Sequence, residues 1–243
     1  MNFKPLLFAL ALGLGLSARA DYTFSFTNGN VTIPDNSASG YQDSHTLSGL
    51  PGIISDVNVT LNLSGGFNGD LYAWLSHDGG LSILLNRVGR SSTNGVGYGN
   101  TGFGPDASQV SFTLDDQAAR DVHFYRFGAY TLNGSGQLTG AWQPDGRILD
   151  PESAGGLFDG AARANLLSVF NGMNPNGGWT LFVADLSSGG VSTLTDWSLQ
   201  IAVVPEPGVL GLWALGLVGL VVRGWRLSRA GQAMALVPSS KTR

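Results

Sequence analysis

Several segments between residues 21 and 203 alternate strictly between apolar and polar positions. In residues 56–64, Val57, Val59, Leu61 and Leu63 are separated by aspartate, asparagine, threonine and serine. A period of two is the pattern of a strand with one buried face and one face toward solvent. The same alternation, or a shorter apolar run, predicts strands at 22–26, 71–75, 81–85, 110–114, 123–127, 179–184 and 197–203.

Clusters of glycine, most of them led by Asn, Asp or Ser, separate these segments. They lie at 65–66, 78–80, 176–178 and 188–190, and glycine supplies the positive φ angles that tight turns require. Many short strands joined in this way predict an all-β protein, an antiparallel jelly-roll sandwich.

The stretch 87–165 interrupts this pattern as a glycine-rich insertion. Residues 87–105 hold six glycines with no period, which predicts a long loop, and long loops in compact domains are usually functional or mobile. Helical spacing of Leu166, Leu167 and Phe170 in residues 159–173 predicts one or two helical turns that cap an end of the sandwich.

Residues 1–20 have the layout of a secretory signal peptide. Lys4 provides a positive start, residues 6–16 form an apolar run, and Ala18 and Ala20 are the small residues that a signal peptidase reads. We expect cleavage before Asp21 and export of the chain. The sequence holds no cysteine, which excludes disulfides, thiol catalysis and cysteine-ligated zinc.

The C-terminal end carries the most specific pattern in the chain. Pro205, Glu206 and Pro207 precede the apolar residues 208–222, and a basic cluster follows, formed by Arg223, Arg226 and Arg229. Fifteen helical residues span about 22 Å, less than the roughly 30 Å of a hydrocarbon core. We therefore expect a short transmembrane helix whose ends are extended by snorkelling arginines and Trp225.

This order of prolines, apolar helix and arginines resembles the PEP-CTERM sorting signal of Gram-negative, exopolysaccharide-producing bacteria. The resemblance covers residues 204–229 and implies transient recognition by an exosortase, an inner-membrane intermediate and loss of the tail near the Pro-Glu-Pro motif. Residues 230–243 extend beyond the usual end of the signal, and we expect them to be disordered. An ordinary single-pass membrane anchor is the alternative.

Charge is divided sharply along the chain. The formal net charge is −4, but all 17 acidic residues lie between Asp21 and Glu206 together with six arginines and no lysine, so this stretch carries −11. The basic residues outside it belong to the two terminal segments. An acidic domain without basic patches does not fit a nucleic-acid partner.

Three blocks of residues 21–203 resemble the P domain (P/Homo B domain) that accompanies subtilisin-like proprotein convertases. They are residues 69–85, with Gly-Asp-Leu at their start, residues 177–185 around Trp179, and residues 189–199 around Trp197. The resemblance implies a galactose-binding-like jelly roll. The segment 21–50 is too short to hold a subtilisin-type catalytic domain.

The sequence contains few residues in the arrangement of a known catalytic motif. His45, His77 and His123 stand apart, none lies in a zinc-binding HExxH helix, and no serine lies in a GxSxG elbow. His77 with Asp70 or Asp78 and an unspecified serine is the nearest approach to a triad. The sequence therefore favours a protein without catalytic residues.

Aspartate and tryptophan are the remaining candidates for binding. Aspartates near predicted turns suggest calcium, which prefers hard oxygen ligands in loops. The candidate ligands are Asn68, Asp70, Asp78, Asp185 and Asp196; the alternative is that they hydrogen-bond to local turns. Trp142, in the polar run 140–146, is the candidate for stacking on a sugar ring.

Together these patterns predict an exported structural or adhesive β-sandwich of the cell surface or exopolysaccharide matrix. Its expected partners are the exosortase, the membrane before processing, and exopolysaccharide or cell-surface components. One alternative is an accessory domain linked to subtilisin-like serine endopeptidase activity. Another is a carbohydrate- or ice-binding module, although an ice-binding face would need a regular threonine array that the sequence lacks.

Overall fold

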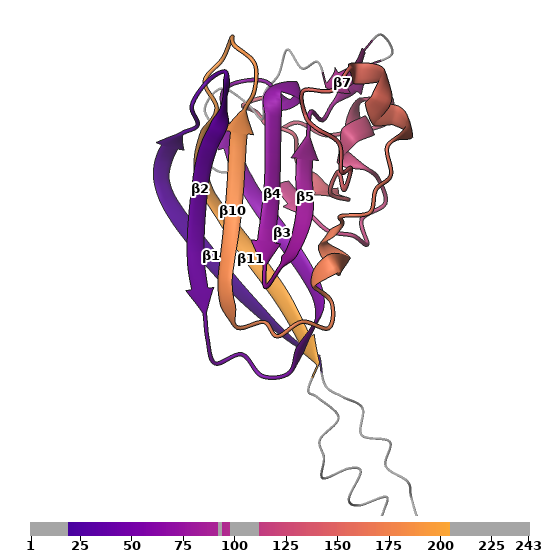
Figure 1. Cartoon of the computed structure of the whole chain (residues 1–243). Coiled ribbons are helices and arrows are strands. Elements are labelled where there is room, and N and C mark those ends of the chain that lie inside the picture. The colour runs from indigo at the N-terminus through magenta and orange to yellow at the C-terminus, as the bar shows by residue number, and fades with distance from the viewer. Residues whose placement is uncertain (1–18, 92–93, 98–111, 205–243) are drawn as a thin grey trace, which may run out of the picture. The chain divides into compact units, whose positions relative to one another are not determined.

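The alternating segments pair into two packed sheets, which a computed structural model describes over residues 19–91, 94–97 and 112–204 (Figure 1). Sheet A has the strand order β1-β11-β3-β8-β9, and sheet B has the order β2-β10-β4-β5. The described residues thus form an all-β sandwich, as the alternation predicted.

Sheet A consists of the three longest alternating segments and two short strands. Its members are β1 (Ala20–Thr32), β11 (Thr193–Val204), β3 (Ile53–Ser64), β8 (Phe112–Leu114) and β9 (Gly140–Trp142). Leu199 of β11 pairs with Phe24 on one side and Val59 on the other. Of the strand pairs in the described residues, β8–β9 alone is parallel.

Sheet B consists of β2 (Ser37–Leu47), β10 (Gly177–Asp185), β4 (Leu71–His77) and β5 (Gly80–Asn86). The β4–β5 turn has φ +46° at Asp78 and φ +80° at Gly79, the two positive angles that a tight hairpin requires. Strand β2 was not predicted, because Asp43 and His45 occupy inward positions where the pattern expects apolar residues. Both are held there by hydrogen bonds, since Asp43 Oδ2 lies 2.9 Å from His45 Nε2 and accepts from the Trp197 indole at 2.7 Å.

The core lies between the two sheets and is apolar. Trp179 and Trp197 are fully buried in it, together with the inward leucines, isoleucines and valines of both sheets. Burying such side chains provides about 1.5–3 kcal/mol each relative to exposure. The apolar positions of the alternating segments are therefore the side chains that face the space between the two sheets.

The described part of the insertion that follows β9 packs against the edge of β5 (Figure 1). The amides of Asp145 and Gly146 donate to the carbonyls of Leu84 and Ile83, and Ile83 N–H donates to Asn165 O, all at 2.9–3.0 Å. Covering an edge strand removes a template for unwanted pairing.

Two expectations for the insertion are wrong in detail. Residues 123–127 form the 3-10 helix η2 (Val122–Phe127) instead of a strand, because Asp121 accepts a hydrogen bond from the His123 amide and starts a helical turn. The long loop contains a small hairpin of β6 (Arg90–Ser91) and β7 (Asn94–Gly97). The 3-10 helix η4 (Leu167–Phe170) lies within the range 159–173 in which one or two helical turns were expected, and a further 3-10 helix, η3 (Gly155–Gly160), precedes it.

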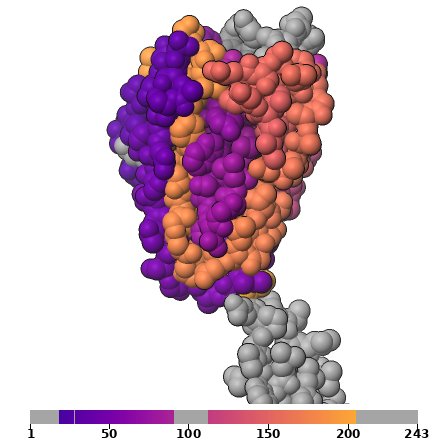
Figure 2. Space-filling model, viewed as in Figure 1, coloured from indigo at the N-terminus to yellow at the C-terminus, as the bar shows by residue number. Residues whose placement is uncertain are grey.

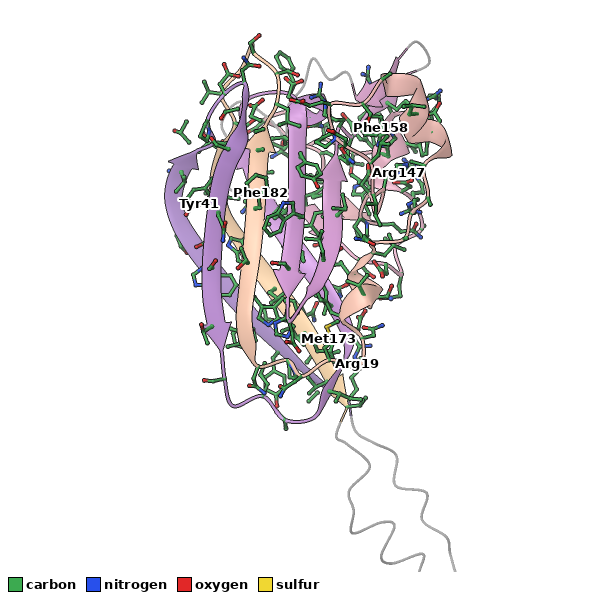
Figure 3. The ribbon with its side chains drawn as sticks, viewed as in Figure 1. Arg19, Tyr41, Arg147, Phe158, Met173 and Phe182 are labelled. Carbon is green, nitrogen blue, oxygen red and sulfur yellow. The ribbon has the colours of Figure 1, made fainter. Side chains whose placement is uncertain are left out.

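A buried polar network holds the insertion together. His123 Nδ1 lies 2.7 Å from Asp145 Oδ2, and both side chains are fully buried. The Arg147 guanidinium contacts Asp145 and, at 2.8 Å, Asp121, while Phe158 stacks parallel to His123. Figure 3 shows Arg147 and Phe158 on this side of the molecule. Because its charges are paired and hydrogen-bonded, the network can stay buried.

The two predicted terminal segments lie largely outside the described residues. Of the signal peptide, only Arg19 and Ala20 are described: β1 begins at Ala20, and Arg19 pairs with Asp21 and Asp56 at 2.9 and 3.1 Å. Ala18, the sorting motif and the helix 208–222 are not described. Over residues 19–91, 94–97 and 112–204 we find no helix with the length and hydropathy needed to cross a membrane.

Candidate functional site

The outer face of sheet B carries aromatic side chains at positions where a strand normally exposes polar residues. In β4 the core takes Leu71, Ala73 and Leu75, so Tyr72 and Trp74 point to the outside and are half-buried. Successive side chains of a strand point to opposite faces. The same strand therefore contributes to the core and to an aromatic surface.

Phe182 of β10 completes the aromatic surface. It stands directly opposite Trp74 in the register of the two strands, and the two rings stack with centroids 5.0 Å apart at 13°. Tyr72 meets Phe182 edge-on at 6.4 Å. On the β2 side the backbone of Gly40 is so close that an added Cβ would lie 2.6 Å from the Phe182 ring. The three rings, which we call the aromatic face, are thus fixed in place; Figure 3 labels Phe182 among them.

Along β2, β10 and β4 the groups beside the aromatic face are neutral and polar. Thr180 and Ser44 share a hydrogen bond of 2.8 Å across β10 and β2, and Gln42 and Ser76 lie on the same side of the sheet. Burial, with a contribution from the charge of Asp150, raises the pKa of Tyr72. Its phenol therefore stays neutral at physiological pH. The outward residues of β2, β10 and β4 from Tyr41 onward carry no charge: Gln42, Ser44, Thr46, Tyr72, Trp74, Ser76, Gly178, Thr180, Phe182 and Ala184.

The insertion flanks this surface. Figure 2 shows the magenta atoms of β4 and β5 between the β2–β10 side and the orange-red segment near residues 146–170. That segment hydrogen-bonds to the backbone of Ile83, which lies beside Trp74 in the sheet and is 2% exposed. The aromatic face is therefore partly accessible to solvent, and this segment of the insertion lies beside it.

Three of the five predicted calcium ligands come together at one end of sheet B. The 3-10 helix η1 (Asn68–Asp70) places Asn68 and Asp70 at the start of β4, and Asp185 ends β10 opposite Leu71. Asp185 is fully buried; its Oδ2 accepts a hydrogen bond of 2.9 Å from Ser192, whereas its Oδ1 has no hydrogen-bond partner. The Oδ1 of Asn68 is buried and unpartnered as well.

We call the end of sheet B that holds Asn68, Asp70 and Asp185 the acidic end. Its electrostatics disfavour the ionised form of both carboxyl groups at once. Burial raises the pKa of Asp70, and the neighbouring charge of Asp185 raises it further. Burial also raises the pKa of Asp185, against the hydrogen bond from Ser192. Arg87 lies nearby and donates to Ser187 Oγ at 3.0 Å, and burial lowers its own pKa. A bound cation or a proton would relieve the repulsion.

The other two predicted ligands lie elsewhere. Asp78 forms the β4–β5 turn, and the seven residues of β4 separate it from Asp70. Asp196 is on β11 of sheet A, where both of its oxygens accept from the Asn62 amide at 2.8–2.9 Å. The five residues therefore do not form one site, because turns that are similar in sequence lie at different ends and on different sheets.

The histidine triad weighed from the sequence is not assembled. The two ring nitrogens of His77 lie 3.0 and 2.7 Å from the carbonyl oxygens of Gly178 and Asn174, and the ring stacks on Trp179 with centroids 4.0 Å apart. Asp70 and Asp78 flank the two ends of β4, so neither orients this ring. His77 supports the core.

Trp142 does not offer an open ring to a sugar, contrary to the prediction. It is 5% exposed, its indole donates to Thr139 O at 3.0 Å, and the Arg120 guanidinium covers one ring face at 4.5 Å. Its position at the end of β9 packs it against the core.

Comparisons with known proteins give only a weak structural likeness. No family model matches the chain, and no curated protein matches it. The complex of the Aeromonas sobria serine protease with the chaperone matches with 16% identity and a TM-score of 0.42, over 78% of this chain and 28% of that one. The structure of the Aeromonas sobria serine protease matches with 17% identity and a TM-score of 0.40, over 77% of this chain and 27% of that one. The chain thus spans little more than a quarter of these structures, and the likeness carries no conclusion about its activity.

The aromatic face was not predicted from the sequence, although the sequence contains a signal for part of it. Tyr72 and Trp74 are out of phase with Leu71, Ala73 and Leu75, and an out-of-phase aromatic residue in a half-buried strand must face outward. Their meeting with Phe182, more than 100 residues later, depends on strand order and register.

Proposed function

We propose that this protein is an exported, non-catalytic adhesive module of the cell surface or exopolysaccharide matrix that binds neutral polysaccharide through the aromatic face. The observation that carries the proposal is the uncharged aromatic surface formed by Tyr72, Trp74 and Phe182. Exposed apolar clusters with a polar rim mark interaction sites.

The chemistry of the face matches a sugar chain. A pyranose ring has an apolar C–H face and a hydroxyl edge, so it pairs with rings such as Trp74 whose π-face is electron-rich. The hydroxyls of Ser44 and Thr180 and the amide of Gln42 supply hydrogen bonds for the sugar hydroxyls. A face without charge neither attracts nor repels a neutral polymer.

Binding of a neutral glucan by the full chain in detergent tests this proposal. We expect Trp74→Ala to raise the dissociation constant on the order of tenfold, and Trp74→Ala with Phe182→Ala to raise it further. The matched control is Asn58→Ala with Gln200→Ala, a contacting pair on the outer face of sheet A. Equal affinity of the double aromatic variant and this control would disprove glycan binding by the face.

Sorting to the surface rests on the terminal motifs. We propose that residues 1–20 direct export and are removed by cleavage after Ala20, and that Pro205, Glu206 and Pro207 with the downstream arginines direct the chain to an exosortase at the inner membrane. Cell fractionation with and without residues 204–243 tests this. Identical partitioning of the two forms would refute the sorting role.

A second candidate is an accessory domain for a subtilisin-like serine endopeptidase. The three P-domain-like blocks supply β4, β5, β10 and β11, which include the central strands of both sheets, and this supports a P-domain-type jelly roll. Co-expression with a subtilisin-like protease from the same genome would then raise the protease's melting temperature. An unchanged melting temperature would remove this candidate.

We also propose calcium at the acidic end. Supporting observations are the buried, unpartnered Oδ1 atoms of Asp185 and Asn68 and the raised pKa values of Asp70 and Asp185. In the part of the chain that the structure describes, no three His, Asp or Glu side chains are grouped to hold a metal. Calcium would therefore need Asn68 and carbonyl oxygens besides the two carboxylates.

Thermal unfolding with calcium or with excess EDTA tests the calcium proposal. Calcium should raise the melting temperature by about 2–4 °C for each kcal/mol of binding free energy, and Asp185→Asn should abolish the rise. An unchanged melting temperature of the wild type in excess EDTA would refute it.

A further inference from the structure

A second surface feature lies in the insertion, away from the aromatic face. It is a hollow of about 280 Å³ that is lined by the side chains of Arg120, Tyr130, Thr131, Thr139 and Trp142 among others. Its size is that of a single sugar residue rather than of a large ligand.

A short hairpin forms one wall of the hollow. Thr139 N–H donates to Thr131 O at 3.0 Å, and the two threonine hydroxyls lie 2.7 Å apart. The Thr139 hydroxyl also donates to Thr131 O at 3.1 Å, so the Thr131 hydroxyl donates to Thr139 and keeps its lone pairs for another donor. Tyr130 is 42% exposed and is fixed edge-on against Tyr125.

Arg120 forms the other wall and has no carboxylate partner among the residues that the structure describes. Its guanidinium donates to Tyr125 O at 3.0 Å and to Ala129 O, and lies over the Trp142 ring. By contrast, four arginines within the described residues contact aspartates: Arg19, Arg90, Arg147 and Arg163. Carbonyl groups orient Arg120 but do not neutralise its charge.

The charge of Arg120 is unusual in its surroundings. Between Asp21 and Glu206 the chain carries −11, so acidic side chains to pair with it are abundant, yet none does so among the described residues. A guanidinium has five N–H donors, and two carbonyl contacts leave donors for a further acceptor. A carboxylate is the acceptor that this fork fits best.

We propose that this hollow binds one carboxylated sugar residue, a uronate, of an acidic polysaccharide. The uronate carboxylate pairs with Arg120, its apolar ring face lies against the exposed ring of Tyr130, and its hydroxyls donate to Thr131. The proposal rests on the proposed function in that its partner is again a polysaccharide, but it uses a different surface and a different chemistry.

Binding of polygalacturonate and of the same polymer after carboxyl reduction tests the hollow, using the full chain in detergent and EDTA. EDTA removes divalent cations that could bridge two acidic partners. Because the domain is strongly acidic, general electrostatics repel the carboxylated polymer, so a preference for it must come from a local site. We expect the wild type to bind polygalacturonate at least tenfold more tightly than the reduced form.

The variants separate recognition from structural support. Arg120→Gln should abolish the preference for the carboxylated polymer, and Arg120→Lys, which keeps the charge without the fork, should retain part of it. Tyr130→Ala, at an exposed position, should weaken binding of both polymers equally. If Arg120→Gln unfolds, Arg120→Lys and Tyr130→Ala still decide the question with the wild type.

The outcomes distinguish this proposal from the proposed function. Loss of carboxylate preference in the Arg120 variants with unchanged binding of a neutral glucan supports the hollow. A wild type without preference, or an Arg120→Gln variant that keeps it, overturns the proposal. Failure of Trp74→Ala with Phe182→Ala to weaken neutral-glucan binding would affect only the aromatic face.

Discussion

The two outer faces of the sandwich are built from the same alternating pattern but differ in chemistry. On sheet A the outward side chains hydrogen-bond to one another, as in Asn62 with Asp196 and Thr60 with Thr113. On sheet B, Trp74 and Phe182 stack in corresponding positions. Alternation therefore ensures that one side of a strand is buried, while the residues at the other positions determine whether the outer side is polar or aromatic.

The largest expected effect compares two tryptophans on opposite sides of sheet B. Trp179 is fully buried and stacked on His77, so Trp179→Ala should destabilise the domain by about 3–5 kcal/mol. Trp74 is half-buried on the outer face, and Trp74→Ala should cost about 1 kcal/mol. Urea denaturation of both variants measures the difference. Equal losses would mean that Trp74 belongs to the core and not to a binding surface.

The next effect concerns the support of the aromatic face. Gly40 has φ +54°, and an added Cβ would lie 2.5 Å from Val183 O and 2.6 Å from the Phe182 ring. Gly40→Ala should therefore cost about 1–3 kcal/mol and displace Phe182, with weaker glucan binding. Gly79→Ala is the matched control, since Gly79 also has positive φ but no atom lies within 4 Å. If the two variants behave alike, φ strain alone explains the result.

Two carboxylates, Asp196 on sheet A and Asp185 on sheet B, differ in burial and in hydrogen bonding. Asp196 of sheet A is paired outward, whereas Asp185 of sheet B is buried with one unpartnered oxygen. Because the pKa of Asp185 is raised, the folded state binds more protons than the unfolded state above the ordinary value near 3.8. Without metal, stability should fall as pH rises from that value through the raised pKa.

Asp185→Asn should flatten this decrease and stabilise the metal-free protein near neutral pH. Denaturation midpoints in EDTA between about pH 4 and pH 7 measure the slope. A slope that is unchanged by the substitution would show that Asp185 does not carry a raised pKa.

The smallest effect is expected on sheet A. Asn62→Ala removes the hydrogen bonds to Asp196 at a partly exposed site and should cost less than about 1 kcal/mol. Neutral-glucan binding should not change. A loss of glucan binding would show that the outer face of sheet A takes part in binding, and the two sheets would then not differ in this respect.

The sequence by itself predicted the all-β sandwich, because alternation in segments such as 56–64 and 197–203 reflects local geometry that each strand shows alone. It also contains the export and sorting motifs, which remain predictions. It missed β2, whose inward His45 is hydrogen-bonded to Asp43, while Asp43 accepts from Trp197, a residue 154 positions further along the chain. It assigned η2 to a strand because short apolar runs do not distinguish the two.

Tertiary structure alone decided where the chemistry lies. Trp74 and Phe182 meet because β4 and β10 pair in one register, and a shift of one residue would move both rings to the other side of the sheet. Asp70 and Asp185 meet, and Asp78 and Asp196 do not, because strand direction determines which turns share an end of the sandwich. Sequence sets the period of each strand; side-chain neighbours across strands depend on pairing between segments far apart in the chain.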